Sequence, residues 1–397
     1  MKTAIIIGGG IAGCSTAFAL SQRGIAVKLI ERHPKLAQEA SGNPLAALYP
    51  KPSAKLDVVS QFSLQGFTFT CNLLNHLPAS ASFYEACGLI QLAFDAREQT
   101  RQQALSKQLS SDFLYAISAK EASEIAGVTL STGGLYLPRA GWVKPAALCE
   151  SLVASQLITI VNNCNALHIK KIQNQWQVHY ANGVMQADNI VICNANDIKQ
   201  LGFCNSAAIT AVRGQINFFA ANEASKPIKV VICSNHTLSP AVDGFHSIGT
   251  TYAPNDTNPH LSDADTLSNL DGLQKIVPAL LADLDIKSIN GRVAWRSQTQ
   301  DYMPLAGQLM DEVELRKNPP RYNAKPADLP WLNSLFVNAG HGSKGMITAP
   351  ICGDLIASLI AKTDLSLDTK LATKLNPSRF LLKELGLKQL ANCLYNK

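Results

Sequence analysis

The sequence predicts an α/β protein with two domains, one built on a largely parallel sheet and the other on a mostly antiparallel sheet. A glycine-rich turn follows the first apolar run, at residues 5–7, and a second glycine turn opens an apolar helix near the C-terminus. Between them, short strand patterns with period two dominate. Because 397 residues exceed what one hydrophobic core usually organises, two domains are expected.

The N-terminal region reads as a strand, a glycine turn, a helix and a second strand. Residues 5–7 are apolar, Gly8-Gly9-Gly10-Ile11-Ala12-Gly13 follows, and helical periodicity leads to an apolar run at 27–30 that ends at Glu31. This order is typical of a βαβ unit that binds a dinucleotide. The alternative is a helix capped by ordinary turn glycines, which does not require the second strand or the carboxylate.

Each residue of this motif has a physical role in dinucleotide binding. Gly8 permits the tight turn, Gly10 lets the backbone approach a pyrophosphate, and Gly13 lets the helix pack closely on the strand. The positive N-terminus of the helix attracts the phosphates. Glu31 lies where an acidic side chain accepts hydrogen bonds from the ribose hydroxyls.

The rest of the chain divides into helical and strand patterns. Helices are predicted at 58–77, 95–109, 146–156 and 263–281, and strands at 85–93, 133–138, 158–161, 167–172, 176–180, 186–193 and 289–295, with further β-rich segments over 213–252. We therefore expect a discontinuous dinucleotide domain formed by 1–85, 133–205 and 330–397. Residues 86–132 and 206–329 are expected to form the substrate domain.

The second glycine turn favours a flavin over a nicotinamide dinucleotide. A strand at 335–338 leads into Gly340-His-Gly-Ser-Lys-Gly345, and a helix follows at 348–361. Backbone N–H groups and a positive helix end suit a flavin ring, which becomes anionic when it is reduced. The alternative is a turn that serves packing alone.

Composition indicates a globular enzyme. The chain is 47% hydrophobic and 16% charged, which argues against a disordered or fibrous protein. The net charge of +6 permits a polyanionic partner without requiring one. Between residues 362 and 397, seven basic residues face three acidic ones, so this tail carries +4 of the total. It is either a surface for a polyanionic partner or an ordinary solvated helical face.

Cysteine usage and hydropathy indicate in which cellular compartment the protein is expected. Ten cysteines occur without a C-x-x-C pair or a spacing suited to zinc, so we expect a cytoplasmic protein without a metal site. The first apolar run is too short for a signal peptide. No stretch is expected to be apolar enough to span a membrane.

Four motifs together resemble the glycine oxidase, sarcosine oxidase and D-amino acid oxidase group of FAD enzymes. They are the N-terminal glycine motif, Arg213-Gly-Gln215, Arg296-Ser-x-Thr-x-Asp-x-x-Pro304 and Gly340-His-Gly-Ser-Lys-Gly345. The resemblance implies an FAD-binding Rossmann-like domain beside an antiparallel substrate domain. It also implies oxidation of a CH–NH group with FAD as the cofactor.

Within that group, the chain resembles the FAD-dependent domain of bifunctional tRNA 5-methylaminomethyl-2-thiouridine biosynthesis proteins. The motifs that carry this resemblance are Ala40-Ser-Gly-Asn43 with Ala47-Leu-Tyr-Pro50, Gly141-Trp142 with Pro145, Gly342-Ser343, Ala349-Pro350 and Leu375-Asn-Pro-x-Arg379. The family implies oxidative removal of the carboxymethyl group of 5-carboxymethylaminomethyl-(2-thio)uridine in tRNA. The products are 5-aminomethyl-(2-thio)uridine and glyoxylate.

The chain departs from this family in two ways. Its flavin motif starts at residue 5, whereas the bifunctional proteins carry an N-terminal methyltransferase domain. Either a separate methyltransferase, as a partner, carries out the methylation, or the sequence is a fragment of a longer chain. Leu45-Ala46 stands where the family pattern has Gln-Gly. Two other functions stay open: an oxidase or dehydrogenase for free glycine, sarcosine or D-amino acids, and a non-catalytic, flavin-stabilised tRNA-binding partner of a methyltransferase.

The resemblance also assigns residues. Arg296 is the candidate for the substrate carboxylate, because a guanidinium binds a carboxylate through two parallel hydrogen bonds; a structural salt bridge with Asp301 is the alternative. Tyr252 is the candidate that closes the pocket or orients the amine, with ordinary strand packing as its alternative. Arg213 and Arg139 are guesses for contact with tRNA phosphate. The residues expected to bind FAD are Gly8, Gly10, Ala12, Gly13, Glu31, Arg32, Ser41, Asn43, Leu48, Val161, Gly340, His341, Gly342, Ser343, Lys344, Gly345 and Met346.

Overall fold

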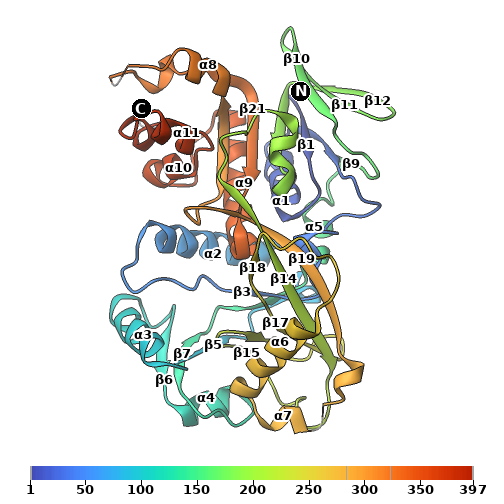
Figure 1. The fold of residues 1–397 in the computed structure, drawn as a ribbon, viewed down its shortest axis with the longest axis vertical. Coiled ribbons are helices and arrows are strands. Elements are labelled where there is room, and N and C mark those ends of the chain that lie inside the picture. Colours follow the sequence, from blue (N-terminus) through green and yellow to red (C-terminus); the bar gives the residue numbers. More distant parts are fainter. Residues whose placement is uncertain (1, 283, 322, 396–397) are drawn as a thin grey trace.

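A computed structural model describes residues 2–282, 284–321 and 323–395. Figure 1 shows an upper half built around a parallel sheet and a lower half built around a second sheet. The upper sheet has six strands in the order β20-β21-β13-β1-β2-β9. Their bounds are β1 Thr3–Ile7, β2 Ala26–Ile30, β9 Ile158–Val161, β13 Asn189–Ile192, β20 Leu305–Met310 and β21 Trp331–Ala339.

All neighbours in this sheet are parallel except β20 and β21. Helix α1 (Ile11–Ser21) joins β1 to β2 and packs against α9 (Gly345–Ala361) and α5 (Pro145–Leu152). Nearly every residue of α1 is buried, which explains why it is apolar on all sides. Pro145 occupies the first turn of α5, where its missing N–H costs nothing.

A three-stranded antiparallel sheet, β10-β11-β12, stands beside the parallel sheet at the upper right of Figure 1. It consists of β10 His168–Ile172, β11 Gln175–Tyr180 and β12 Gly183–Ala187. The segment 186–193, expected as one strand, is therefore two. Asp188 separates β12 from β13, and the chain passes there from the small sheet to the parallel sheet.

The lower half contains a nine-stranded sheet in the order β18-β14-β17-β16-β15-β5-β7-β6, with β19 paired along β14. The strands are β5 Leu89–Leu92, β6 Tyr115–Ile117, β7 Gly134–Leu137, β14 Ile209–Ala220, β15 Val231–Cys233, β16 Thr237–Leu238, β17 Phe245–Gly249, β18 Ala253–Pro254 and β19 Asn290–Thr299. The helices of this half are α3 Ala96–Gln108, α4 Ala119–Ala126, α6 Asp263–Ile276 and α7 Ala279–Ala282.

A small sheet and one long helix complete the region where the two halves meet. The sheet has the order β3-β8-β4, formed by β3 Ala46–Leu48, β4 Tyr84–Glu85 and β8 Gly141–Val143. Helix α2 (Val58–His76) packs against α9. Asp57 caps α2 by accepting a hydrogen bond from the Ser60 N–H.

The C-terminal region folds back beside the parallel sheet. It contains α8 Glu312–Lys317, α10 Thr369–Leu375 and α11 Arg379–Glu384, and α8 and α11 contribute Leu315, Leu381 and Leu382 to a small apolar core. The 3₁₀ turns of the chain are η1 Ala40–Gly42, η2 Ser80–Ser82, η3 Ala195–Leu201, η4 Ile286–Ser288, η5 Pro326–Asp328, η6 Gly342–Lys344 and η7 Leu390–Asn392.

Two strands pair in the other half of the molecule from the one to which the sequence assigned them. β20 falls within 206–329, yet it pairs with β21 at the edge of the parallel sheet. β7 falls within 133–205, yet it pairs with β5 and β6 in the nine-stranded sheet. Both pairings are antiparallel contacts at places where the chain passes between the halves, and pattern alone does not show which partner such a strand takes.

One helix contradicts the expectation that no segment is apolar enough to cross a membrane. Residues 342–361 are long and apolar enough by length and composition. In the structure, α9 is covered by α1 and α2, and twelve of its residues are buried. Core packing therefore accounts for its apolar composition.

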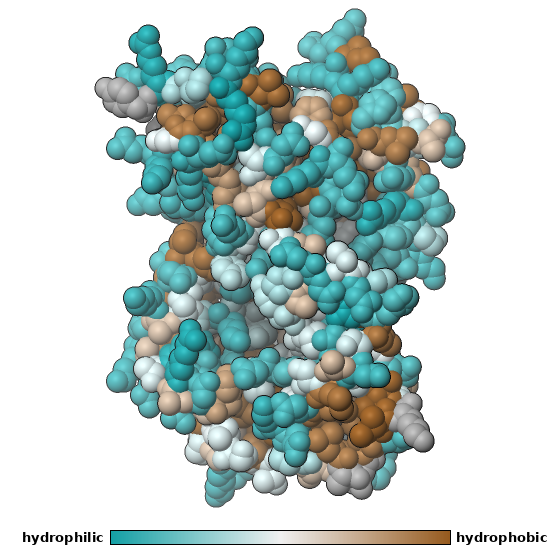
Figure 2. Space-filling model, in the orientation of Figure 1, coloured by the Kyte–Doolittle hydropathy of each residue, from teal (hydrophilic) through white to brown (hydrophobic). Residues whose placement is uncertain are grey.

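The surface shown in Figure 2 is mostly hydrophilic, with hydrophobic residues gathered at its lower right corner. That corner corresponds to the region of α6 and α7 in Figure 1. Exposed apolar side chains in this part of the chain are Leu261, Leu267 and Ile286.

Candidate active site

A long cavity opens at the carboxyl ends of the parallel strands and reaches the nine-stranded sheet. Its lining comes from the turn after β1, the segments after β2 and β13, the loop before β3, strand β19 and the turn after β21. The carboxyl edge of a parallel sheet is where such folds bind ligands. Because strands of both sheets contribute, the cavity can hold a cofactor and a substrate side by side.

The first glycine turn has the geometry that its sequence predicts. Gly8 has φ +110°, which side chains rarely adopt, and a Cβ on Gly13 would lie 1.9 Å from the Gly8 carbonyl oxygen. A Cβ on Gly10 would meet only the Ser41 hydroxyl, at 3.3 Å. Gly13 is thus required for packing of α1 on β1, whereas Gly10 leaves the cavity side of the turn open.

Glu31 is fixed at the end of β2 by the backbone. Its side chain is buried, and its two oxygens accept hydrogen bonds from the Gly9 N–H at 2.7 Å and the His33 N–H at 2.9 Å. The neighbouring Arg32 forms ion pairs with Glu39 and Asp197, both at 2.7 Å. Glu31 therefore holds the glycine turn in place and presents a carboxylate to the cavity.

The loop that contains η1 is held from both sides. Ser41 accepts a hydrogen bond from the Ile11 N–H at 3.0 Å, so it caps the first turn of α1. From the opposite side, Arg292 of β19 donates to the Asn43 side-chain oxygen at 2.8 Å and to the carbonyl oxygens of Gln38 and Glu39. A Cβ on Gly42 would lie 2.8 Å from the Arg292 guanidinium. One arginine of the substrate sheet thus fastens this loop.

The second glycine turn contains a buried histidine. His341 Nδ1 lies 2.9 Å from the Thr348 hydroxyl, and its Nε2 lies 3.0 Å from the Asn338 side-chain oxygen. Burial lowers the pKa of His341 to about 3, so the ring is neutral at physiological pH. Nearby, Lys344 donates to the Ser63 hydroxyl at 2.8 Å, and burial lowers its pKa although Asp57 acts in the opposite direction.

Arg296 lines the cavity from β19, and its guanidinium is held by neutral groups. It donates to the Thr250 hydroxyl at 2.8 Å and to the Thr251 carbonyl oxygen at 3.3 Å. Burial lowers its pKa, and Tyr252 offsets this only in part. Gly214 makes room for it, since a Cβ there would lie 2.6 Å from the guanidinium. No Asp or Glu of the described residues pairs with Arg296.

Asp301 binds another residue instead. Both of its oxygens accept hydrogen bonds from Arg379, at 2.8 and 2.9 Å. The alternative of a structural salt bridge between Arg296 and Asp301 is therefore wrong. A partly buried guanidinium without a carboxylate partner, facing a cavity, is suited to bind the carboxylate of a ligand.

Most residues expected to bind the cofactor line the cavity: Gly8, Gly10, Ala12, Glu31, Arg32, Ser41, Asn43 and all of 340–346. Gly13, Leu48 and Val161 are not among the lining residues, because Gly13 packs under the turn, Leu48 is fully buried in β3 and Val161 ends β9. Tyr252 is 56% exposed and also lies outside the lining.

Sequence reasoning missed the segment after β13, which lines the cavity with Cys193, Asn194 and Asn196, and it missed Tyr49, Lys51 and Thr250. The segment after β13 had a recognisable signal, since an apolar strand is followed by Asn-Ala-Asn. Polar residues at the carboxyl end of a parallel strand are candidates for ligand contact. The other three residues lie in irregular segments or strand ends without such a signal.

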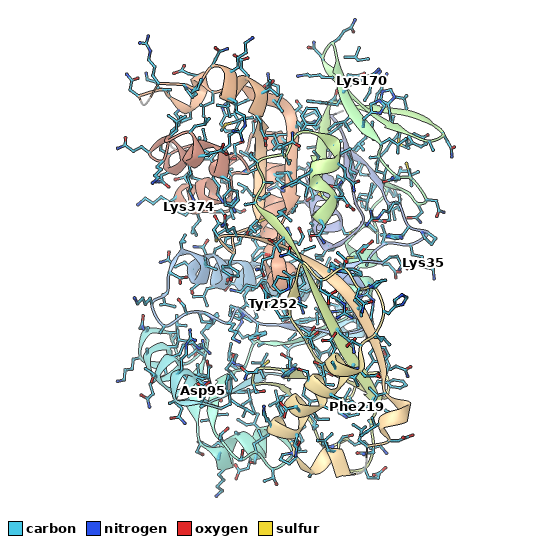
Figure 3. All side chains as sticks on the ribbon, viewed as in Figure 1. Lys35, Asp95, Lys170, Phe219, Tyr252 and Lys374 are labelled. Atoms are coloured by element: carbon cyan, nitrogen blue, oxygen red, sulfur yellow. The ribbon has the colours of Figure 1, made fainter. Side chains whose placement is uncertain are left out.

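Two basic residues of the segments considered for tRNA contact are buried. Arg213 is 1% exposed and bound to Asp265, and Arg379 is 2% exposed and bound to Asp301. Lys397 falls outside the described residues. In the C-terminal segment, Lys362, Lys370, Lys383 and Lys388 are exposed, and Lys374 projects outward at the left edge of Figure 3. The described residues contain no group of three metal-binding side chains.

Comparison with known proteins identifies the family. The model of the family described as "FAD dependent oxidoreductase" matches residues 3–359, which is most of the chain. The chain belongs to this family of FAD-dependent oxidoreductases. The fold, the FAD cofactor and the class of enzyme that the sequence predicted are thereby confirmed.

The curated relatives are bifunctional tRNA-modifying proteins. The chain is 38% identical over 394 residues to the tRNA 5-methylaminomethyl-2-thiouridine biosynthesis bifunctional protein MnmC of Methylobacillus flagellatus, covering 98% of this chain and 61% of the relative. The MnmC protein of Pseudomonas syringae pv. syringae is 37% identical, with 97% and 59% covered. The chain thus spans about three fifths of the length of these relatives.

Solved structures of other FAD oxidoreductases share the fold. Glycine oxidase from Bacillus cereus superposes with a TM-score of 0.74 at 21% identity, covering 92% of this chain and 96% of the oxidase. L-proline dehydrogenase from P. horikoshii superposes with a TM-score of 0.76 at 17% identity, covering 96% and 98%. At these identities the likeness concerns the fold.

The residues of this FAD-dependent oxidoreductase fit its cofactor. Three buried polar atoms that belong to cavity-lining residues have no hydrogen-bond partner among the described residues: Asn194 Oδ1, Asn196 Oδ1 and Ser297 Oγ. Such atoms are costly to bury unless a ligand satisfies them. With the open backbone at Gly10, the carboxylate of Glu31 and the turn at 340–346, they form a site suited to the hydroxyl, phosphate and ring groups of FAD.

Replacement of Arg292 by methionine is expected to weaken FAD retention by at least roughly 10-fold, because the loop that contains Ser41 and Asn43 loses three hydrogen bonds to a charged donor. The measurement is the rate at which flavin fluorescence appears after dilution of the holoprotein. The exposed Arg97→Met provides the matched control. Equal FAD release from wild type and Arg292→Met would contradict the role assigned to this arginine.

The buried His341 predicts a specific pH dependence of stability. Its folded pKa of about 3 lies below the unfolded value of about 6.5, so below pH 6.5 the unfolded chain takes up a proton that the folded one does not. Its contribution is therefore complete above pH 6.5 and is lost as pH falls toward 3. Between pH 7.5 and 5.5, wild type should lose about 1.4 kcal/mol more than His341→Gln in urea unfolding.

The exposed His76 offers a control for this measurement. His76→Gln is the matched substitution at an exposed position outside the cavity, and it controls for the loss of a histidine as such. If His341→Gln and wild type lose the same stability over this pH range, the histidine is not kept neutral by the fold.

Proposed function

We propose that this chain oxidises the carboxymethylaminomethyl group of 5-carboxymethylaminomethyl-(2-thio)uridine in tRNA, giving 5-aminomethyl-(2-thio)uridine and glyoxylate. The names of the curated relatives, which cover the chain at about 37% identity, support tRNA as the substrate. The single observation that carries the reaction is the unpaired Arg296 guanidinium in a cavity shared with the FAD site. The group to be oxidised is an N-substituted glycine, and its carboxylate is the natural partner of that guanidinium.

The residues around Arg296 orient the substrate. The Thr250 hydroxyl and the Thr251 carbonyl fix the guanidinium plane, so a bound carboxylate is held in one orientation. The glycyl carbon next to the carboxylate is then held in the same cavity as the turn at 340–346. The two-electron acceptor for the hydride that leaves this carbon would be supplied by FAD when it is bound.

The remaining steps need only water and proton transfer. Loss of a hydride from the glycyl carbon leaves a carbon–nitrogen double bond, and water adds to that carbon. The carbon–nitrogen bond then breaks, the nitrogen stays on the nucleoside as a primary amine, and the carbon leaves as glyoxylate. Lys344 and the neutral His341 line the same cavity as Arg296 and contribute one positive and one uncharged group. The scheme uses no carboxylate as a general base.

The proposal extends to partners and place of action. The chain spans about 60% of the length of its relatives, which are bifunctional. We propose that a methyltransferase acts on the aminomethyl product, and that both reactions take place in the cytoplasm together with tRNA. An oxidase for free glycine, sarcosine or a D-amino acid is the second candidate, since Arg296 would hold the carboxylate of any of these.

The test is anaerobic reduction of the bound flavin. Holoprotein is mixed with tRNA that carries 5-carboxymethylaminomethyl-2-thiouridine, and separately with glycine, sarcosine and D-amino acids, while flavin absorbance and glyoxylate are followed. Rapid bleaching by the modified tRNA with matching glyoxylate supports the proposal. Bleaching by a small amino acid alone would make the chain an amino-acid oxidase. Binding of tRNA without bleaching by any substrate would indicate a non-catalytic tRNA-binding protein.

A further inference from the structure

Tyr252 combines exposure with a fixed orientation. Its side chain is 56% exposed, and its hydroxyl accepts a hydrogen bond from the Gln298 amide at 2.8 Å. Figure 3 shows it near the middle of the molecule, at the level where the two halves meet. The face of such a ring is open to solvent. Because the hydrogen bond already fixes the orientation of the ring, the side chain loses little conformational entropy when a ligand binds to that face.

Tyr252 stands directly beside the guanidinium that would bind the substrate carboxylate. The two preceding residues, Thr250 and Thr251, accept the hydrogen bonds of Arg296. The Thr251 carbonyl belongs to the peptide group that joins Thr251 to Tyr252, so this peptide group contacts the guanidinium directly. Tyr252 also acts electrostatically on Arg296. The ring therefore lies at the outer side of the Arg296 site, outside the cavity lining.

Gln298 ties the ring to the second glycine turn. It follows Arg296 by two positions on β19, so both side chains leave the same face of the strand. A Cβ on Gly342 would lie 3.5 Å from the Gln298 side chain, and Gln298 pairs with His341 through an isolated β-bridge. The pair of Tyr252 and Gln298 thus forms part of the rim between the substrate sheet and the turn at 340–346.

We propose that Tyr252 is a stacking platform for the nucleobase of the substrate, and that Gln298 positions its ring. The inference rests on the proposed function. In 5-carboxymethylaminomethyluridine only a few covalent bonds separate the carboxylate from the pyrimidine ring. With the carboxylate on Arg296, the ring stays at the mouth of the cavity, beside Tyr252. Stacking on an exposed aromatic side chain is a common way in which proteins hold an unpaired RNA base.

The test uses an anticodon stem-loop RNA with the modified uridine at the wobble position and the same RNA with an abasic wobble position. Tyr252→Ala should weaken binding of the modified RNA by roughly 5- to 150-fold, as expected for the loss of one stacked base. Binding of the abasic RNA should not change with this substitution. The two changes are then non-additive, which a general loss of structure cannot produce.

Further variants separate the ring from its hydroxyl. Tyr252→Trp keeps an aromatic face and should retain most of the affinity, whereas Gln298→Ala should give a smaller loss than Tyr252→Ala. Tyr115→Ala, at an exposed tyrosine on β6 at the far edge of the nine-stranded sheet, should leave RNA binding unchanged.

Two results overturn the inference. One is equal weakening of both RNAs by Tyr252→Ala, which would assign the tyrosine to backbone contact or folding. The other is no weakening of either RNA. Failure of the proposed function is detected separately, in the wild-type protein alone. In that case wild-type holoprotein would leave the modified RNA unoxidised, whatever the binding results for the Tyr252 variants.

Discussion

Replacement of Arg296 by alanine is expected to lower kcat/KM for an N-substituted glycine substrate by about 10³-fold, with FAD still bound. Arg296 is the only described cation of β19 that lines the cavity, since Arg292 is engaged with residues 38–43. Without it, the substrate carboxylate loses two charge-assisted hydrogen bonds and the glycyl carbon loses its fixed position. The measurement is glyoxylate release, together with the flavin spectrum of the purified variant.

Two further substitutions show how Arg296 acts. Arg296→Lys keeps the positive charge but not the planar fork, and should recover only part of the activity. Thr250→Val removes the hydroxyl that accepts from the guanidinium at 2.8 Å, and should cost roughly 10-fold through lost orientation. Full activity of Arg296→Ala would show that another group binds the carboxylate, and Lys344 would be the next residue to test.

Local sequence patterns were sufficient to predict the residues on the cofactor side of the cavity. The glycines of the first turn are dictated by backbone geometry, as the 1.9 Å approach at Gly13 shows, and such requirements are visible in the sequence. The same holds for the turn at 340–346 and for Glu31 at the end of β2. These residues lie within one βαβ unit or one strand-turn-helix unit, so their neighbours in space are also neighbours in sequence.

Long-range partners could not be predicted in the same way. Arg292 fastens a loop that lies about 250 positions earlier in the chain, and Arg213, which looked suited to tRNA, is buried on Asp265. A guanidinium has the same sequence signature whether it binds a ligand, a backbone carbonyl or a carboxylate. Only the fold decides which of these it meets, because strand pairing places β19 along β14 and beside η1.

The ion pair of Arg379 and Asp301 is the largest expected determinant of stability among these long-range contacts. Arg379 is 2% exposed, and besides both Asp301 oxygens it donates to the carbonyl oxygens of Met303 and Pro304. Arg379→Met should lower the free energy of unfolding by about 3 kcal/mol, because it leaves a half-buried carboxylate and four carbonyl oxygens without this charged donor. Urea unfolding measures this loss.

The pH dependence of that loss follows from Asp301. Burial raises the pKa of its carboxyl group, but the hydrogen bonds and charge of Arg379 outweigh burial and hold the pKa below its ordinary value. The stabilisation is therefore complete above the unfolded pKa of about 3.9 and is lost as pH falls through the lower folded value. The difference between wild type and Arg379→Met should accordingly narrow in acid.

A second ion pair of the C-terminal region supplies the control. Arg316 pairs with Glu384 at 2.6 Å, but both side chains are exposed, so water and salt screen the interaction. Arg316→Met should change stability little at any of these pH values. The contrast tests burial as the cause, because both are arginine–carboxylate pairs and each has one partner on α11. If Arg379→Met proves as mild as Arg316→Met, then the apolar core around Leu381 and Leu382, rather than the ion pair, holds α11 against the loop that follows β19.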